Sequence, residues 1–297
     1  MSDLGETGQK PCLQPGLTNR LLGYSQEQRL LILNLDDFGM CHGVNQGIIK
    51  VLEAGIARST SLMVCCPWAN EAVEYLRQHP DTHFGVHMTA VVDSTNYNFG
   101  PCLPIDQVPD LVDAQGHFWG FYEFHDPSRS IDLGQMEREF RRQIQIVYEL
   151  GLQPDHLDWH SIRLDKKPGA FDMMLGLARE FSLPLRVFGT ENIHNVQAMG
   201  LPCNDHDLLD SYLIEPSGQS SRYAELALEL KPGLNEWAIH PGLANEELLA
   251  IDPSAFGNRQ RDTDYWTSSE ARQMLEAQGV VVLDYSALQP FWKFQEV

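Results

Sequence analysis

Basic residues are scarce in this chain of 297 residues. Its 21 lysines and arginines stand against 41 aspartates and glutamates, which gives a formal net charge of −20. Proteins that bind nucleic acids or anionic membrane surfaces need basic patches that attract phosphate groups. The acidic balance therefore argues against a nucleic-acid partner and against a polyanionic substrate.

Long apolar runs and paired cysteine motifs are also missing. No stretch approaches the ~20 apolar residues of a membrane-spanning helix. The first 29 residues have neither the basic start nor the apolar segment of a secretory signal. The six cysteines show no CxxC spacing, so we expect reduced thiols rather than zinc ligands. These absences predict a cytoplasmic protein without a membrane span.

The chain does contain strand-like segments that alternate with helix-like ones. Strands are expected near residues 30–36, 61–66, 84–90, 154–160, 184–188, 236–242 and 280–285. Amphipathic helices are expected near residues 45–55, 69–80, 134–150, 169–182 and 268–278. Such alternation is typical of parallel βα units. About seven or eight of these units favour a TIM-like (β/α) barrel over a two-domain arrangement.

The expected domain organisation is simple. Residues 1–28 show weak periodicity and are interpreted as an amino-terminal extension of unknown role, and residues 29–297 as a single domain. Residues 91–131 are rich in Asn, Pro, Gly and aromatic side chains, and a loop of that length inside a compact domain is usually functional.

Four of the predicted strands carry side chains at or near their ends that can bind a metal. These side chains are Asp36, Asp37, His87, Asp158, His160 and His240. In barrels, the carboxyl ends of the strands meet at the active-site face. Adjacent carboxylates repel each other unless a cation lies beside them, and an imidazole and carboxylate set suits Zn²⁺ better than Mg²⁺. The alternative is that the aspartates cap a turn and the histidines are ordinary core residues.

The segments LNLDDFGMCHGVNQGI, GIARSTSLMV, GVHMTA, PDHLDWH and EWAIHPG resemble, in this order, the YdjC-like family of carbohydrate deacetylases. The resemblance covers about residues 30–290. It implies a distorted βα barrel that removes an N-acetyl group from an amino sugar. By the same resemblance, Asp36 is the general base and His240 the general acid. The ligands of one divalent ion, Mg²⁺ or Zn²⁺, are then Asp37, His87 and His160.

One segment departs from the family pattern. The family often reads Asp-Ser-His-x-His-x-His where this chain reads DWHSIRL at residues 158–164, so the two later histidines are absent. Trp159 replaces a small residue and could stack on a sugar ring. Asp158 is a candidate to orient a ligand histidine, or else an ordinary strand-end cap.

Two further residues are candidates for substrate contact. Asn45 follows the paired aspartates closely and either binds substrate or caps the next helix. Arg186 ends a predicted strand and either lies in the site, where it could pair with an acid, or is a surface residue.

Two other functions compete with deacetylation. One is a metal-dependent sugar isomerase or epimerase, although such barrels normally gather several Glu and Asp ligands. The other is a non-catalytic carbohydrate-binding relative, which the loss of a metal ligand or of the base would favour. This chain has the expected residue at all five positions, namely Asp36, Asp37, His87, His160 and His240. The expected partner is a small carbohydrate. The oligomeric state stays open, with a homodimer as one option.

Overall fold

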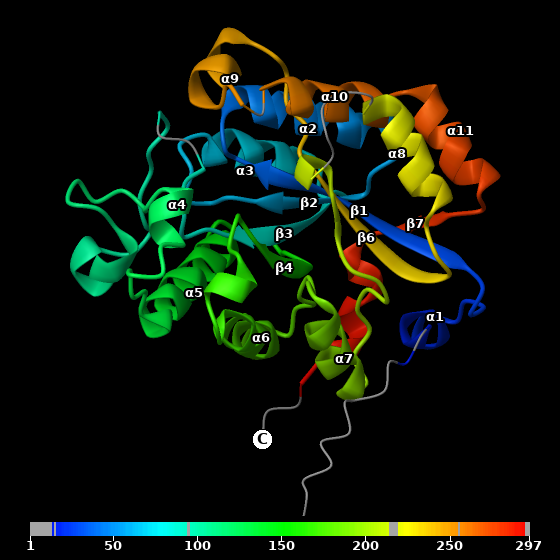
Figure 1. Cartoon of the computed structure of the whole chain (residues 1–297), viewed down its shortest axis with the longest axis horizontal. Helices are drawn as coiled ribbons and strands as arrows, with labels where there is room; N and C mark the ends of the chain where they lie inside the picture. The colour runs from blue at the N-terminus through cyan, green and yellow to red at the C-terminus, as the bar shows by residue number, and fades with distance from the viewer. Residues whose placement is uncertain (1–13, 15, 94–95, 214–218, 255, 295–297) are drawn as a thin grey trace, which may run out of the picture.

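The computed structural model describes residues 14, 16–93, 96–213, 219–254 and 256–294. Its centre is a seven-stranded sheet in the order β4-β3-β2-β1-β6-β5, with β7 beside β1 (Figure 1). The strands are β1 (Arg29–Phe38), β2 (Ser59–Leu62), β3 (His83–Met88), β4 (His156–Trp159), β5 (Leu209–Asp210), β6 (Gly233–Ile239) and β7 (Val281–Leu283). The pairings of these strands are parallel. The sheet curls into a half-barrel, which confirms the predicted distorted (β/α) barrel.

Helices lie on both sides of this sheet. They are α1 (Leu17–Leu22), α2 (His42–Ala54), α3 (Ala69–Gln78), α4 (Phe121–Phe124), α5 (Leu133–Glu149), α6 (Ala170–Phe181), α7 (Thr190–Ala198), α8 (Gln219–Leu228), α9 (Glu246–Ile251), α10 (Phe256–Trp266) and α11 (Ser269–Ala277). In Figure 1, α2, α3 and α10 lie above the sheet and α5, α6 and α7 below it. Among the described residues, no helix combines the length and apolar composition needed to cross a lipid bilayer.

Strand β1 is the central element. Its residues 29–35 pair with β6, while its first half also pairs with β7 and its second half with β2. The side chains from Leu30 to Leu33 are at most 1% exposed. A strand that is covered on both faces has apolar residues at successive positions. This explains why apolar and polar residues do not alternate in β1 before Asn34.

The structure contains β5 and the helices α7, α8, α9 and α10, which were not predicted from the sequence, and it differs from two of the stated expectations. The strand expected at residues 184–188 is reduced to a single parallel bridge between Leu157 and Leu185. Within the expected amino-terminal extension, residues 1–13 and 15 lie outside the described residues, whereas α1 packs against β6. The Thr18 hydroxyl there donates to the Cys203 carbonyl at 2.6 Å.

Helix α2 packs closely on the loop that follows β6. A Cβ atom added at Gly47 would lie 2.5 Å from the backbone N and Cα of Gly242, which cannot move as a flexible side chain could. We expect Gly47→Ala to lower the free energy of unfolding by about 1–3 kcal/mol, as overpacking does. Urea denaturation measures this change.

Gly176→Ala is the matched control for that substitution. Gly176 lies at an exposed position of α6, and an added Cβ meets no atom within 4 Å. The control should gain roughly 0.5–1 kcal/mol, because glycine is unfavourable inside a helix. Similar effects at both positions would contradict close packing at Gly47.

Candidate active site

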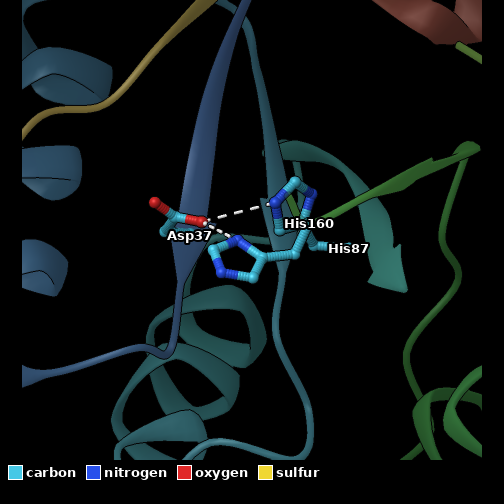
Figure 2. Close-up of side chains that lie close together, drawn as sticks. All are labelled: Asp37, His87 and His160. Atoms are coloured by element: carbon cyan, nitrogen blue, oxygen red, sulfur yellow. Dashed lines mark hydrogen bonds and ion pairs between the residues drawn. The ribbon is translucent and has the colours of Figure 1, made fainter. Parts of the chain in front are cut away.

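Three side chains from separate strands meet at the carboxyl end of the sheet. Oδ1 of Asp37 lies 2.9 Å from Nδ1 of His160 and 3.3 Å from Nε2 of His87. One ligand atom from each residue lies within 4.8 Å of the other two, and all three residues are buried. Figure 2 shows both imidazoles pointing at the one carboxylate. The structure thus brings together the three residues predicted as metal ligands.

The backbone of β1 places Asp37 for this contact. Asp37 has a φ of 76°, a left-handed conformation that is uncommon for residues other than glycine and concentrates at functional sites. Its second oxygen, Oδ2, accepts a hydrogen bond of 2.7 Å from Arg259 of α10. Burial acts to raise the pKa of Asp37, but Arg259 and His160 outweigh it and hold the pKa well below its usual value. The carboxylate is therefore ionised.

The two histidines are each held from the side away from Asp37. Nδ1 of His87 lies 2.8 Å from Oδ1 of Asp158, and Nε2 of His160 lies 2.8 Å from Oδ2 of Asp93. Carboxylates in such positions fix the ring orientation and the tautomer of metal-binding histidines. The orienting role considered for Asp158 thus has a matching contact. Asp93 was not among the predicted residues, since it lies in the aperiodic loop after β3.

This donor set fits a divalent ion. One carboxylate oxygen and two imidazole nitrogens converge, which is a ligand set suited to Zn²⁺ and related first-row ions. Three protein ligands leave further coordination positions for water and substrate.

Asp36 precedes Asp37 in the chain but pairs with a different arginine. Arg186 donates to both of its oxygens, at 2.7 Å to Oδ2 and 2.8 Å to Oδ1, and Asn34 donates to Oδ1 at 2.7 Å. Burial acts to raise the pKa of Asp36, but the Arg186 guanidinium outweighs it and lowers the pKa. Asp36 is thereby held as a carboxylate.

Arg186 is buried among carboxylates. Besides Asp36, it contacts Glu236 at 2.7 Å and Asp158 at 3.2 Å, and its side chain is 4% exposed. The hydroxyl of Tyr285 donates to the same oxygen of Glu236 at 2.6 Å. Arg186 therefore lies in the site and pairs with acidic side chains, which was one of the two options considered from the sequence. Direct contact of Arg186 with substrate stays a prediction.

His240 faces Asp36 from the neighbouring strand. Its Nε2 lies 3.9 Å from Oδ2 of Asp36, while its Nδ1 lies 3.0 Å from the Ser211 hydroxyl. Asp262 accepts hydrogen bonds from the Ser211 hydroxyl at 2.6 Å and from the backbone N–H of His240 at 2.7 Å. Tyr223 also donates to Asp262. The orientation of the imidazole is thus set by residues that the sequence did not single out.

The other two predicted substrate residues are occupied with internal contacts. The Asn45 side chain accepts from the Gly39 N–H at 2.7 Å and donates to Glu71 at 2.7 Å, so it fixes the loop after β1. Trp159 is 8% exposed, and its indole N–H donates to the Ile162 carbonyl at 3.1 Å. A sugar contact by either residue stays a prediction.

The assembled groups are of the types that hydrolysis with acid and base catalysis requires. A metal-competent cluster lies beside a carboxylate that can accept a proton and an imidazole that can donate one. General acid–base catalysis needs such a pair within reach of one reacting centre.

Comparison with known proteins identifies the family of this chain. Residues 30–277 match the family model of YdjC-like proteins. The carbohydrate deacetylase of Thermoanaerobacter pseudethanolicus is 29% identical over 88% of this chain and 99% of its own length. That of Vibrio cholerae O1 (strain M66-2) is 30% identical over 87% of this chain and 96% of its own length.

A solved structure gives the same result for the fold. It comes from Enterococcus faecalis V583 and is assigned provisionally to cellobiose-phosphate cleavage. It superposes with a TM-score of 0.78 and 27% sequence identity, covering 88% of this chain and 99% of that one. The family match spans most of the barrel, and this chain belongs to the YdjC-like family.

Proposed function

We propose that this protein is a carbohydrate N-deacetylase that depends on one divalent metal ion. The observation that carries the proposal is the meeting of Asp37, His87 and His160, with Asp36 and His240 beside them. Membership of the YdjC-like family and relatives named carbohydrate deacetylases support it.

The ion fits between Asp37, His87 and His160, where it would polarise the acetyl carbonyl and make a water molecule more acidic. Oδ2 of Asp36, the oxygen that faces His240, accepts the proton of the attacking water. Nε2 of His240 gives a proton to the departing nitrogen, because an amide nitrogen leaves poorly without one. Ser211 holds the opposite nitrogen of that ring.

The two alternatives have less support. An isomerase or epimerase normally gathers several carboxylate ligands, whereas this cluster has one carboxylate and two imidazoles. A non-catalytic relative would not need the paired Asp36 and His240 at 3.9 Å. Deacetylation uses both groups.

The test is acetate release from a panel of N-acetylated amino sugars and chito-oligosaccharides. We expect release by the purified protein, loss of release after a chelator removes metal, and recovery when Zn²⁺, Mn²⁺ or Mg²⁺ is added back. An unreduced rate in the chelated, metal-free protein would refute metal dependence. A rearranged sugar without acetate would favour the isomerase.

The proposal also covers the cellular location and the binding partners of the enzyme. We place it in the cytoplasm, with a small carbohydrate as substrate and no nucleic-acid partner. A homodimer is the oligomeric state to test by sedimentation, because the sequence leaves this point open.

A further inference from the structure

A second cluster of metal-competent side chains lies at the other end of the sheet. His83 is the first residue of β3, Asp155 directly precedes β4, and Asp284 directly follows β7. Strand β7 pairs with Leu30, Leu31 and Ile32 of β1, near the start of that strand, so the end of β7 lies about level with the start of β3. These residues are therefore separate from the active site, whose side chains lie toward the carboxyl ends of β1, β3 and β4.

The spacing of the donor atoms matches coordination of one ion. Nδ1 of His83 lies 3.1 Å from Oδ2 of Asp155 and 3.7 Å from Oδ1 of Asp284. One atom from each of the three residues lies within 4.8 Å of the others. Ligand distances of about 2.1 Å place neighbouring donors roughly 3.0–3.4 Å apart around one ion. The distance from His83 to Asp155 lies within this range, and the distance from His83 to Asp284 exceeds its upper end by about 0.3 Å.

Neighbouring residues fix both carboxylates in place. Nδ1 of the buried His156 lies 2.7 Å from Oδ1 of Asp155, and the His156 ring stacks on Tyr285 with centroids 3.9 Å apart. Ser286 donates its backbone N–H at 3.0 Å, and its hydroxyl, to Oδ1 of Asp284. Outer contacts of this kind orient carboxylate ligands toward a metal.

A cavity borders two of the three residues of this cluster. Its volume is about 510 Å³, and it is lined by His83 and Asp155 together with Ser286, Gln289 and Lys293. The His83 side chain is 41% exposed, so the cluster is open to solvent on one side. Lys293 on the cavity wall and Arg58 near His83 both oppose cation binding, and they match the two carboxylates of the cluster in number. The geometry of the donor atoms, rather than net charge, therefore carries the proposal.

We propose that His83, Asp155 and Asp284 form a second divalent-cation site, distinct from the catalytic one and suited to Zn²⁺ or a similar first-row ion. One imidazole and two carboxylates provide three ligands, and water from the cavity completes the coordination. The bound ion ties the segment after β7 to the starts of β3 and β4. Its role is to stabilise this end of the barrel.

Zinc stoichiometry of the full-length protein tests the proposal. After equilibrium dialysis against Zn²⁺, the wild type should hold about two ions per chain, one at each three-ligand cluster. His83→Ala and Asp284→Asn should each hold about one fewer. Asp81→Asn removes the same charge at an exposed position two residues before His83 and should leave the stoichiometry unchanged. Circular dichroism verifies that each variant is folded.

A double variant separates this inference from the proposed function. His87→Ala/His160→Ala removes two catalytic ligands, so the remaining Zn²⁺ should lie at the second site and should raise Tm. Adding His83→Ala should abolish both effects. No Zn²⁺ uptake by the double variant would overturn the second site and leave the deacetylase proposal standing. Equal uptake by the double variant and the wild type would instead overturn the catalytic ligand set.

Discussion

Replacing Asp36 by asparagine should lower kcat for acetate release by about 10²–10⁴-fold, the range typical of a positioned general base. Asparagine has nearly the same shape, but its amide cannot accept the proton of the attacking water. The Asp37, His87 and His160 cluster is untouched by the change, so bound metal should stay at the wild-type level. Acetate release and metal content, measured on the same preparation, distinguish loss of the base from loss of the ion.

Asp172→Asn serves as the control for this charge change. Asp172 is exposed on α6, far along the chain from the site residues on β1, and its loss should leave kcat unchanged. A thermal melt of Asp36→Asn checks that the Arg186 contacts still support the fold. Wild-type kcat in Asp36→Asn would remove this residue from the role of base.

Arg186→Ala should be strongly destabilising, with a loss of about 3–5 kcal/mol in the free energy of unfolding, as expected when one partner of a buried ion pair is removed. The arginine contacts Asp36, Asp158 and Glu236, and all three carboxyl groups are buried. Without it, these groups must take up protons or stay charged without a counterion. Urea denaturation at constant pH measures the loss.

Two further variants show whether the loss of stability in Arg186→Ala comes from the buried charge. Arg222→Ala removes an exposed arginine, paired with Glu225 at 3.0 Å, and should change stability by less than about 1 kcal/mol. Arg186→Lys keeps the charge but not the planar set of donors, so it should fall between the wild type and Arg186→Ala. Equal stability of Arg186→Ala and Arg222→Ala would show that the buried carboxylates do not depend on Arg186.

Much of the barrel could be predicted from local sequence signals. The strand expected near residues 30–36 is part of β1, and its apolar run before Asn34 is buried. The helix expected at residues 134–150 is α5, because its apolar side chains recur at helical spacing and are buried together. Such signals lie within a single element and do not depend on which other element packs against it.

Helix α10 shows why other parts could not be predicted. The side chains it buries include Arg259, Asp262 and Thr263, so its inner face is polar and lacks the apolar stripe that marks an amphipathic helix. That face is polar because it contacts Asp37 and the backbone of His240. The polar pattern of α10 is explained only by these partners, since Asp37 lies 222 positions before Arg259 and His240 lies 22 positions before Asp262.

The candidate site likewise contains residues that could be predicted from the sequence and residues that could not. The side chains that meet at the centre lie in the last residues of strands or directly after them, and these positions could be predicted from the sequence. The residues that orient them could not: Asp93 lies in an aperiodic loop, and Ser211 follows β5, a strand of only two residues. Long-range partners of this type leave no periodic signal in the chain.

The separate arginine partners of the two neighbouring aspartates have a consequence for assembly of the enzyme. The sequence suggested that a cation bound by one of the two aspartates relieves their repulsion. The structure adds a second source of positive charge, since Arg186 pairs with Asp36 and Arg259 pairs with Asp37. The polypeptide therefore carries its own counterions and can adopt this architecture before any metal arrives. Under the proposed metal dependence, loading and removal of the ion would be reversible events on a preformed scaffold, unlike the metal-driven folding of small zinc domains.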